Sequence, residues 1–205
     1  MLKSLDKPKK IIVSVLFILF LLVTILVIFD KFSYIDKFVY ELLMSNRSDF
    51  LDKYFITITR FGDVGMVMFI LLLFLIIFKD RRGIFLNISA ISSVGVNYVL
   101  KHLIRRSRPD ELRLIEQGGF SFPSGHTMIS VCVYGYLLYL VKSSIKNKTL
   151  KYILSTILVL LILSIGISRI YVGVHYFSDV LAGYLLASVI LILVIVYTNK
   201  YFRGK

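Results

Sequence analysis

The stretch SRIYVGVHYFSD, residues 168–179, places an arginine, a histidine and an aspartate between two long apolar runs. Apolar runs of this kind are typical of helices that cross a membrane. His175 and Asp179 are four residues apart, so on a helix they share one face, where a carboxylate can fix the tautomer of an imidazole. Arg169 adds a permanent cation suited to a phosphate or a carboxylate. The stretch predicts a connection between two spans and an anion site within it.

Similar apolar runs recur along the whole chain, which has 205 residues and is 58% hydrophobic. That fraction exceeds the one typical of soluble domains and argues against an ordinary soluble protein. We therefore expect an all-α polytopic membrane protein, a six-helix bundle in which residues 1–205 form a single domain. The first run lacks a signal-peptide cleavage site, which favours an uncleaved span. The predicted spans are residues 11–29, 62–78, 83–100, 126–141, 150–167 and 180–198.

Residues 30–61, between the first two spans, are too polar to cross a membrane. Their apolar side chains recur with helical spacing, which predicts two amphipathic helices in the membrane interface with Asp, Lys and Arg facing water. Two interpretations remain open at this point. The segment is either a packing lid without chemistry or a gate beside a lipid entrance.

The net charge of +13 is spread between the apolar runs and forms no continuous basic stripe. Lipid headgroups are therefore the expected anionic partner, nucleic acid is not, and no sequence feature indicates an obligate protein partner. The segments predicted on the inner side hold more than half of the 25 Lys and Arg residues. This bias places both termini in the cytoplasm and the anion site on the extracytoplasmic side of the plasma membrane. The single cysteine, Cys132, excludes an intrachain disulfide.

The loop between the third and fourth spans, residues 101–125, is a second dense cluster of polar residues. Lys101 closes the third span, and Arg108 is held extended because it precedes a proline. Arg105 and Arg106 are interpreted as surface or headgroup charges, and His102 as a bystander.

The end of this loop, Pro123-Ser124-Gly125-His126, opens the fourth span. Proline suits a first helical turn, and we expect the small residues Ser124 and Gly125 to leave backbone N–H groups accessible. Such a helix start is either an ordinary cap or an anion site, with the Ser124 hydroxyl as an extra donor. A histidine directly after it favours the anion site.

In a six-span arrangement these segments all end on one side of the membrane and can converge. Three cations around two histidines repel a divalent metal, and Asp179 is the one carboxylate expected at hand, so we expect neither a metal nor a cofactor. Ionisable residues at membrane depth are functional by default, which leaves a transporter or channel as the alternative class. A transport path would scatter charges near the midplane, whereas here they cluster at one end. The converging residues are Lys101, Arg108, His126, Arg169, His175 and Asp179.

These residues resemble the three-part signature of the type 2 phosphatidic acid phosphatase superfamily of membrane lipid-phosphate phosphatases. Lys101 is followed after six residues by Arg108-Pro109, then by residues 123–126, and last by Ser168-Arg169, five residues, His175, three residues and Asp179. The resemblance covers about residues 60–195. The longer strings FSFPSGHTM and GISRIYVGVH look most like the bacterial phosphatidylglycerophosphate phosphatases of type B.

The resemblance implies a metal-independent lipid phosphatase with two histidines in different roles. His175, oriented by Asp179, would attack phosphorus to form a phosphohistidine, and His126 would donate a proton to the leaving oxygen. The implied substrate is first phosphatidylglycerophosphate, with undecaprenyl diphosphate and phosphatidic acid as alternatives. The implied phosphate-binding residues are Lys101, Arg108, Ser124, Gly125 and Arg169.

Overall fold

The structure is a computed structural model that describes residues 5–77, 82–110 and 112–203. The end of the predicted second span at residue 78, and most of the basic loop 79–82, lie outside the described residues. Over the described ranges the chain is helical and forms no strand. The helices are α1 (Lys7–Ile28), α2 (Ser33–Ser45), α3 (Asp49–Thr59), the short 3₁₀ helix η2 (Arg60–Gly62), α4 (Val64–Ile77), α5 (Arg82–Ile104), α6 (Gly125–Ser144), α7 (Lys148–Tyr171) and α8 (Phe177–Arg203).

Five of these helices, α1, α5, α6, α7 and α8, are long and apolar enough to cross a membrane. The predicted second span corresponds to α4, which has 14 residues and is about 21 Å long, short of the ~30 Å of a bilayer core. Residues 49–62, which include α3 and η2, precede α4 with a bend of 48°, and the two parts together pass as one further candidate. The all-α prediction is confirmed, with five spans, or six if the bent pair is one span.

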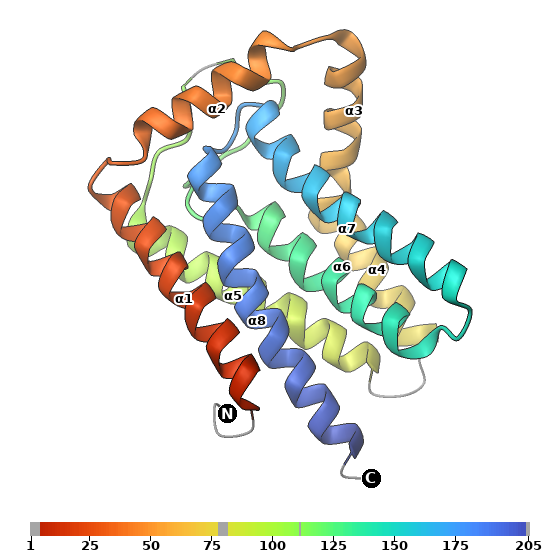
Figure 1. The fold of residues 1–205 in the computed structure, drawn as a ribbon. Coiled ribbons are helices and arrows are strands. Elements are labelled where there is room, and N and C mark those ends of the chain that lie inside the picture. The colour runs from red at the N-terminus through yellow and green to blue at the C-terminus, as the bar shows by residue number, and fades with distance from the viewer. Residues whose placement is uncertain (1–4, 78–81, 111, 204–205) are drawn as a thin grey trace.

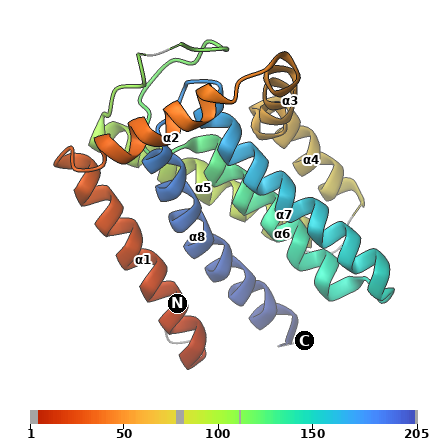
Figure 2. The same cartoon turned by 45° about the horizontal axis from the view of Figure 1, so that its top comes forward.

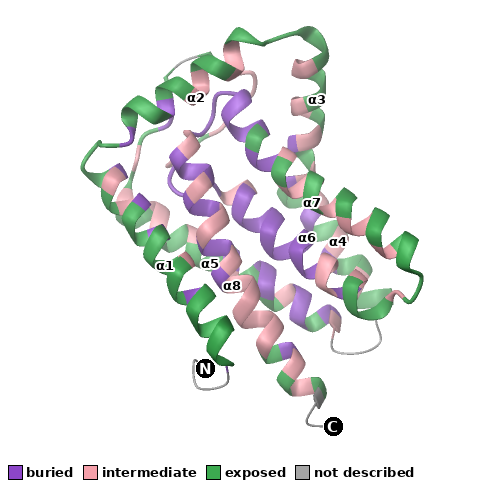
Figure 3. Ribbon diagram, in the orientation of Figure 1, coloured by how far each residue is buried: buried purple, intermediate pink, exposed green. Residues whose placement is uncertain are grey.

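The central helix of the bundle is α6, which packs against α5, α7 and α8. Figure 3 shows that the buried residues concentrate along α6 and at the end where α7 meets α8. Helix α1 covers the outer side of α8. The first residues of α1 and the last of α8 lie at the same end of the bundle (Figure 1), while α2 lies across the opposite end (Figure 2).

The outer faces of the helices are apolar, the reverse of a soluble protein. Ile18 of α1 is 62% exposed, Ile91 of α5 is 68% exposed and Leu160 of α7 is 56% exposed. Large apolar side chains directed outward from several long helices are expected where the surrounding solvent is lipid. Together with the long apolar helices, they define a multi-pass membrane protein.

Several helix starts follow from a local rule in the sequence. Ser48, Ser124 and Asn147 each precede a helix and accept a hydrogen bond from the backbone N–H three residues later. Such a side chain satisfies an N–H group that the helix itself leaves unpaired. For α6 this cap places the helix start one residue before His126.

Helix α2 departs from the amphipathic prediction at one residue. Its large apolar side chains Tyr34 and Phe38 are 81% and 57% exposed, whereas Asp36 is only 2% exposed. The prediction that the acidic residues of 30–61 all face water is therefore wrong for Asp36. The reason is tertiary, because Asp36 faces polar groups at the start of α8.

Helices α2 and α3 are held against the bundle by an apolar cluster. Its buried members are Tyr171, Val172 and Val174, from the end of α7 and the turn that follows. Side chains of both helices pack on it, among them Leu43 and Phe55. Segment 30–61 thus packs directly over the turn that carries the histidine of the opening stretch.

Candidate active site

His175 and Asp179 meet as predicted, although not on one helix. Gly173 lies within the α7–α8 turn with a φ of +75°, and a Cβ there would collide with the carbonyl oxygen of Leu112. His175 follows in the turn, with its backbone N–H donating to the carbonyl oxygen of Arg169 at 3.1 Å, and Asp179 lies in the first turn of α8. The expectation of a shared helical face is wrong, because the chain turns sharply before α8 begins.

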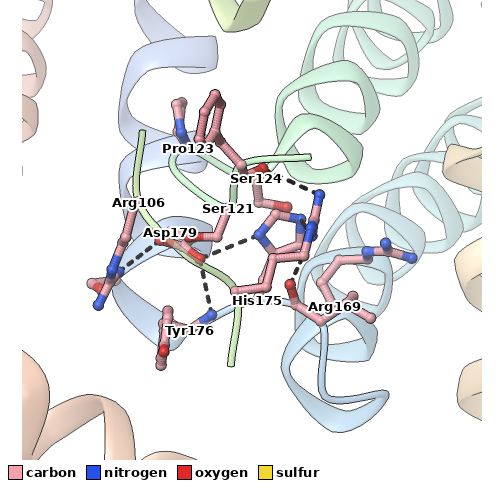
Figure 4. Close-up of polar contacts among 12 residues, drawn as sticks. Arg106, Ser121, Pro123, Ser124, Arg169, His175, Tyr176 and Asp179 are labelled. Carbon is pink, nitrogen blue, oxygen red and sulfur yellow. Dashed lines mark hydrogen bonds and ion pairs between the residues drawn. The ribbon is translucent and has the colours of Figure 1, made fainter. Parts of the chain in front are cut away.

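The Asp179 carboxylate is buried, and both of its oxygens have partners. Oδ2 lies 3.2 Å from His175 Nδ1 and accepts the backbone N–H of Tyr176 at 3.0 Å. Oδ1 accepts from the guanidinium of Arg106 at 2.7 Å. Figure 4 shows Asp179 between Arg106 and His175. Because a carboxylate can only accept, His175 carries its proton on Nδ1.

The other ring nitrogen of His175, Nε2, lies 3.1 Å from the guanidinium of Arg108. Arginine can only donate, so Nε2 presents its lone pair. Arg108 is itself buried and fixed by the carbonyl oxygens of Val174, Gly118 and Gly119. The two contacts select the neutral Nδ1–H tautomer of His175.

The electrostatic surroundings agree with a neutral imidazole. Burial lowers the pKa of His175 well below its ordinary value, and the positive charges of Arg169, Arg108 and Lys101 lower that pKa further. A buried imidazole among cations is costly to protonate. His175 therefore keeps the Nε2 lone pair that a nucleophile needs.

The interpretation of Arg106 as a surface or headgroup charge is wrong. Its side chain is 16% exposed and forms ion pairs with Asp179 at 2.7 Å and with Asp36 at 2.8 Å. Burial alone would lower the pKa of Arg106, but the carboxylates of Asp179 and Asp36 raise it above the ordinary value. Arg106 and Asp36 are residues that the sequence analysis did not assign to the site.

Asp36 connects α2 to this network through α8. It accepts the backbone N–H of Ser178 at 2.8 Å and the Ser178 hydroxyl at 2.7 Å. One sequence signal points to this residue. Asp36 shares the inward face of α2 with the apolar residues Val39 and Leu43, spaced at three and seven residues, where a water-facing acid is not expected.

Arg169, in the last turn of α7, is fully buried. Its backbone carbonyl oxygen accepts the N–H of His175, which places it beside the His175–Asp179 pair. Its guanidinium donates to the Thr59 hydroxyl at 2.6 Å and to the side chain of Gln117 at 2.9 Å. The Nε atom has no hydrogen-bond partner among the described residues. A buried guanidinium with an unused donor is an uncommon arrangement that an anion would complete.

Lys101 and Ser124 approach the site from α5 and α6. Lys101 Nζ donates to the backbone carbonyl oxygens of Phe120 and Ser121. The backbone N–H of Ser124 donates to the carbonyl of Asp179 at 3.0 Å, so the expected free N–H at this position is wrong. The Ser124 hydroxyl accepts from Thr127, which leaves its own hydrogen to donate. Pro123 precedes this cap and does not enter the first helical turn, and Gly125 is the first residue of α6.

His126 lies close enough to the pair for its charge to act on His175, but it forms no hydrogen bond with it. Its Nε2 instead lies 2.8 Å from Oδ1 of Asp63, in the bend between η2 and α4. The expectation that Asp179 is the one carboxylate at hand is therefore wrong, since Asp36 and Asp63 also belong to the neighbourhood. Asp63 directly precedes α4, close to the start of a predicted span, and no local motif indicates it.

The converged arrangement has four cations, Lys101, Arg106, Arg108 and Arg169, around a buried histidine–aspartate pair. Within the described parts of the chain no group of three or more His, Cys, Asp or Glu side chains is arranged to hold a metal ion. A cavity of about 350 Å³ lies on the α2 side of the pair, where Asp36, Tyr40 and Arg106 line it together with His175. The arrangement offers a neutral nucleophile, a second histidine and donors for an anion.

Fold and site together define the class of this protein. It is a polytopic helical membrane protein with a buried histidine–aspartate pair and a cationic cluster at one end of the bundle. Residues 82–203 match the PAP2 superfamily, and the chain belongs to that family. The resemblance drawn from the three-part signature is confirmed.

The chain is also similar in sequence to individual phosphatases. The chain is 39% identical over 114 residues to "Phosphatidylglycerophosphatase B" of Bacillus subtilis (strain 168), covering 54% of this chain and 55% of that protein. It is 30% identical over 156 residues to "Undecaprenyl-diphosphatase" of Sulfolobus acidocaldarius, covering 73% of this chain and 71% of that one. The match thus spans about half the length of the Bacillus relative.

A solved structure shares the fold. The crystal structure of a transmembrane PAP2 type phosphatidylglycerolphosphate phosphatase from Bacillus subtilis superimposes with a TM-score of 0.83 at 29% identity. The superposition covers 92% of this chain and 96% of that chain. The helical arrangement described above is therefore that of a PAP2 membrane phosphatase.

Proposed function

We propose that the protein is an integral membrane phosphatase that removes phosphate from a lipid phosphate through a phosphohistidine at His175. The observation that carries the proposal is the fixed tautomer of His175. Its Nδ1–H faces Asp179, and its Nε2 lone pair faces the cationic cluster. Family membership and the Bacillus relative support the reaction class.

The first step forms a bond between Nε2 of His175 and phosphorus while the bond from phosphorus to the lipid oxygen breaks. The leaving oxygen takes a proton from His126, and the imidazolium that forms at His175 is stabilised by Asp179. In the second step water attacks phosphorus and gives a proton to His126. The electron pair of the N–P bond returns to Nε2, which releases inorganic phosphate.

The phosphate oxygens carry the charge that develops in both steps. We assign their binding to Lys101, Arg108 and Arg169, with the Ser124 hydroxyl and the backbone N–H of Gly125. The unpaired Nε of buried Arg169 supports this assignment, because fixed donors that await a charged group lower the barrier without reorganising. No step requires a metal ion.

The substrate proposed first is phosphatidylglycerophosphate, by analogy with the named function of the Bacillus relative. Undecaprenyl diphosphate is the second candidate, because the Sulfolobus relative named for it aligns over a larger share of both chains. Phosphatidic acid completes the set. We further propose that residues 1–205 act as one domain, with both termini in the cytoplasm and the site on the extracytoplasmic side.

The test is phosphate release by the purified protein across a panel of these three lipids, with His175→Ala as the blank. We expect release from at least one lipid, no release by the blank, and full activity in excess chelator. Activity that a chelator abolishes would contradict the metal-free mechanism. Failure to hydrolyse any lipid phosphate, with transport of one across vesicles instead, would favour the rival class.

A further inference from the structure

The bend between α3 and α4, residues 59–63, forms a wall of the site that lies outside the segment matched to the family, residues 82–203. Three of its residues form hydrogen bonds with side chains of α6 or α7. Thr59 accepts from buried Arg169 at 2.6 Å, and the carbonyl oxygen of Phe61 accepts from Tyr134 of α6 at 2.7 Å. Asp63 holds His126 at 2.8 Å. The bend is therefore fixed to both α6 and α7.

Gly62 shows how closely this wall approaches His126. A Cβ at Gly62 would lie 2.8 Å from Cδ2 of the imidazole, closer than real Cβ contacts. The ring is thus packed edge-on against the backbone of the bend. Packing by Gly62 and the hydrogen bond to Asp63 act on adjacent atoms of one ring edge, Cδ2 and Nε2.

We infer that Asp63 is the positioning residue for His126, in the way that Asp179 is for His175, so that the site contains two carboxylate–histidine pairs. This inference rests on the proposed function, in which His126 exchanges a proton with the leaving oxygen. Asp63 accepts the Nε2–H of His126, which leaves Nδ1 as the nitrogen that gives and later takes the proton. When Nδ1 is protonated, the carboxylate stabilises the resulting imidazolium.

The two pairs differ in exposure in a manner that suits two roles. His175 and Asp179 are almost completely buried, with side-chain exposures of 2% and 0%. The His126 side chain is 17% exposed and that of Asp63 is 53% exposed. A histidine at the rim can exchange protons with water between turnovers, which the buried nucleophile cannot do. The half-exposed Asp63 therefore acts by orienting His126 and by stabilising its charged form.

A competing explanation is that Asp63 merely caps α4, since its carbonyl oxygen accepts the N–H of Val67 at 3.0 Å. Asn caps helices as well as Asp does. Asp63→Asn therefore preserves a cap and removes the carboxylate charge. Asp49→Asn is the matched control, because it removes an exposed carboxylate from the first turn of the neighbouring α3.

The decisive experiment compares two leaving groups. With an alkyl lipid phosphate, Asp63→Asn should lower kcat by about 10- to 100-fold with little change in KM, since general acid catalysis contributes 10²–10⁴-fold. A nitrophenyl phosphate leaves without protonation. The variant should then release the first equivalent of nitrophenol at the wild-type rate and turn over slowly afterwards, because water activation still needs His126.

Gly62→Ala should reproduce the loss in kcat by displacing the ring, whereas Gly65→Ala, where a Cβ meets no atom within 4 Å, should not. An Asp63→Asn variant that matches Asp49→Asn with both leaving groups would overturn the inference. An equal loss with both leaving groups, in the first turnover as well, would also overturn it, because a structural defect does not depend on the leaving group.

A readout without turnover separates this inference from the proposed function. The thermal midpoints of Asp63→Asn, His126→Gln and the double variant form a double-mutant cycle. If the two residues are paired, the midpoint of the double variant should fall by less than the sum of the decreases in the two single variants. Coupling in a protein that hydrolyses no lipid phosphate would reject the function and retain the pair. Additive losses would reject the pair even in an active enzyme.

Discussion

At the scale of single residues, Asp179 is the group on which the tautomer of His175 depends. Its two oxygens serve His175, Tyr176 and Arg106, and its side chain is fully buried. An amide in its place would present a donor as readily as an acceptor. Nδ1 of His175 would then lose its fixed proton, and the Nε2 lone pair facing Arg108 would no longer be assured.

We predict that Asp179→Asn lowers kcat for phosphate release by at least about 10³-fold, with the protein still folded, as expected when a histidine takes the wrong tautomer. The measurement is steady-state phosphate release beside a thermal midpoint in detergent. A loss smaller than tenfold in a folded variant would show that the tautomer is fixed by other contacts.

The buried setting of His175 also predicts a pH dependence. Its pKa lies below the ordinary value of about 6.5, so the neutral nucleophile persists as the pH falls and is lost only when the pH passes through the lowered pKa. The acidic limb of phosphohistidine formation should therefore have its midpoint below pH 6.5, once the ionisation of the substrate phosphate is subtracted. A midpoint at pH 7 or above that moves on Asp179→Asn would contradict this.

The residues that the sequence revealed are those whose partners are local or belong to the three-part signature. His175 and Asp179 are four residues apart, and Ser124 caps an N–H group three residues later. The sequence did not predict the roles of Asp36, Asp63 and Arg106, because their partners in the site are respectively 142, 63 and 73 residues away along the chain. A lone acid beside an apolar run has no local sign of the histidine or arginine that folding brings to it.

At the scale of elements, α2 is attached to the site by a charged contact and an apolar one. The ion pair between Asp36 and Arg106 lies at 2.8 Å, with side-chain exposures of 2% and 16%. The same helix carries a second pair, Lys37 and Glu41, at 3.8 Å and largely exposed. The two pairs on α2 offer an internal comparison of buried and exposed charges.

Breaking the buried pair should destabilise the protein, because a buried charge left without its partner costs on the order of 3 kcal/mol. We predict that a double-mutant cycle of Asp36→Asn and Arg106→Gln shows a coupling above about 1 kcal/mol in the free energy of unfolding. The cycle of Lys37→Gln and Glu41→Gln serves as the control and should give less than about 0.5 kcal/mol. Equal couplings would mean that the Asp36–Arg106 ion pair does not hold α2 against the bundle.

The sequence also predicted the helices of the interfacial segment, but it did not predict how they pack against the bundle. Helical spacing correctly indicated α2 and α3, since apolar periodicity is a local property. It could not show that α3 continues through η2 into α4 with a bend, because that bend is fixed by Thr59, Phe61 and Asp63 contacting α6 and α7. The packing on Tyr171 and its neighbours makes this segment a cover over the site, and the lid and gate interpretations of 30–61 both stay predictions.

At the scale of the whole molecule, the site and the chain ends lie at opposite ends of the bundle. The loop after α5, with Asp110, belongs to the site end, and the α6–α7 connection, with Lys146, belongs to the other end. The one native cysteine, Cys132, is completely buried. It should contribute little background in thiol labelling of the folded protein.

We predict that Asp110→Cys reacts with a membrane-impermeant thiol reagent added to intact cells, and that Lys146→Cys reacts only after the cells are permeabilised. This follows from the excess of basic residues at the end that carries the termini. The reverse pattern would place the site in the cytoplasm and would leave the chemistry of the site unchanged.

The central claim, a phosphate carried on His175, is tested most directly by trapping it. The protein is mixed with a lipid phosphate labelled with ³²P, quenched in alkali, which preserves phosphohistidine, and digested for mass spectrometry. His126→Ala, used with a nitrophenyl phosphate, should increase the yield because it slows attack by water. We predict one labelled site, at His175, that is lost on acid treatment and absent from His175→Ala. Label on another residue, or phosphate release at the wild-type rate by His175→Ala, would contradict the account.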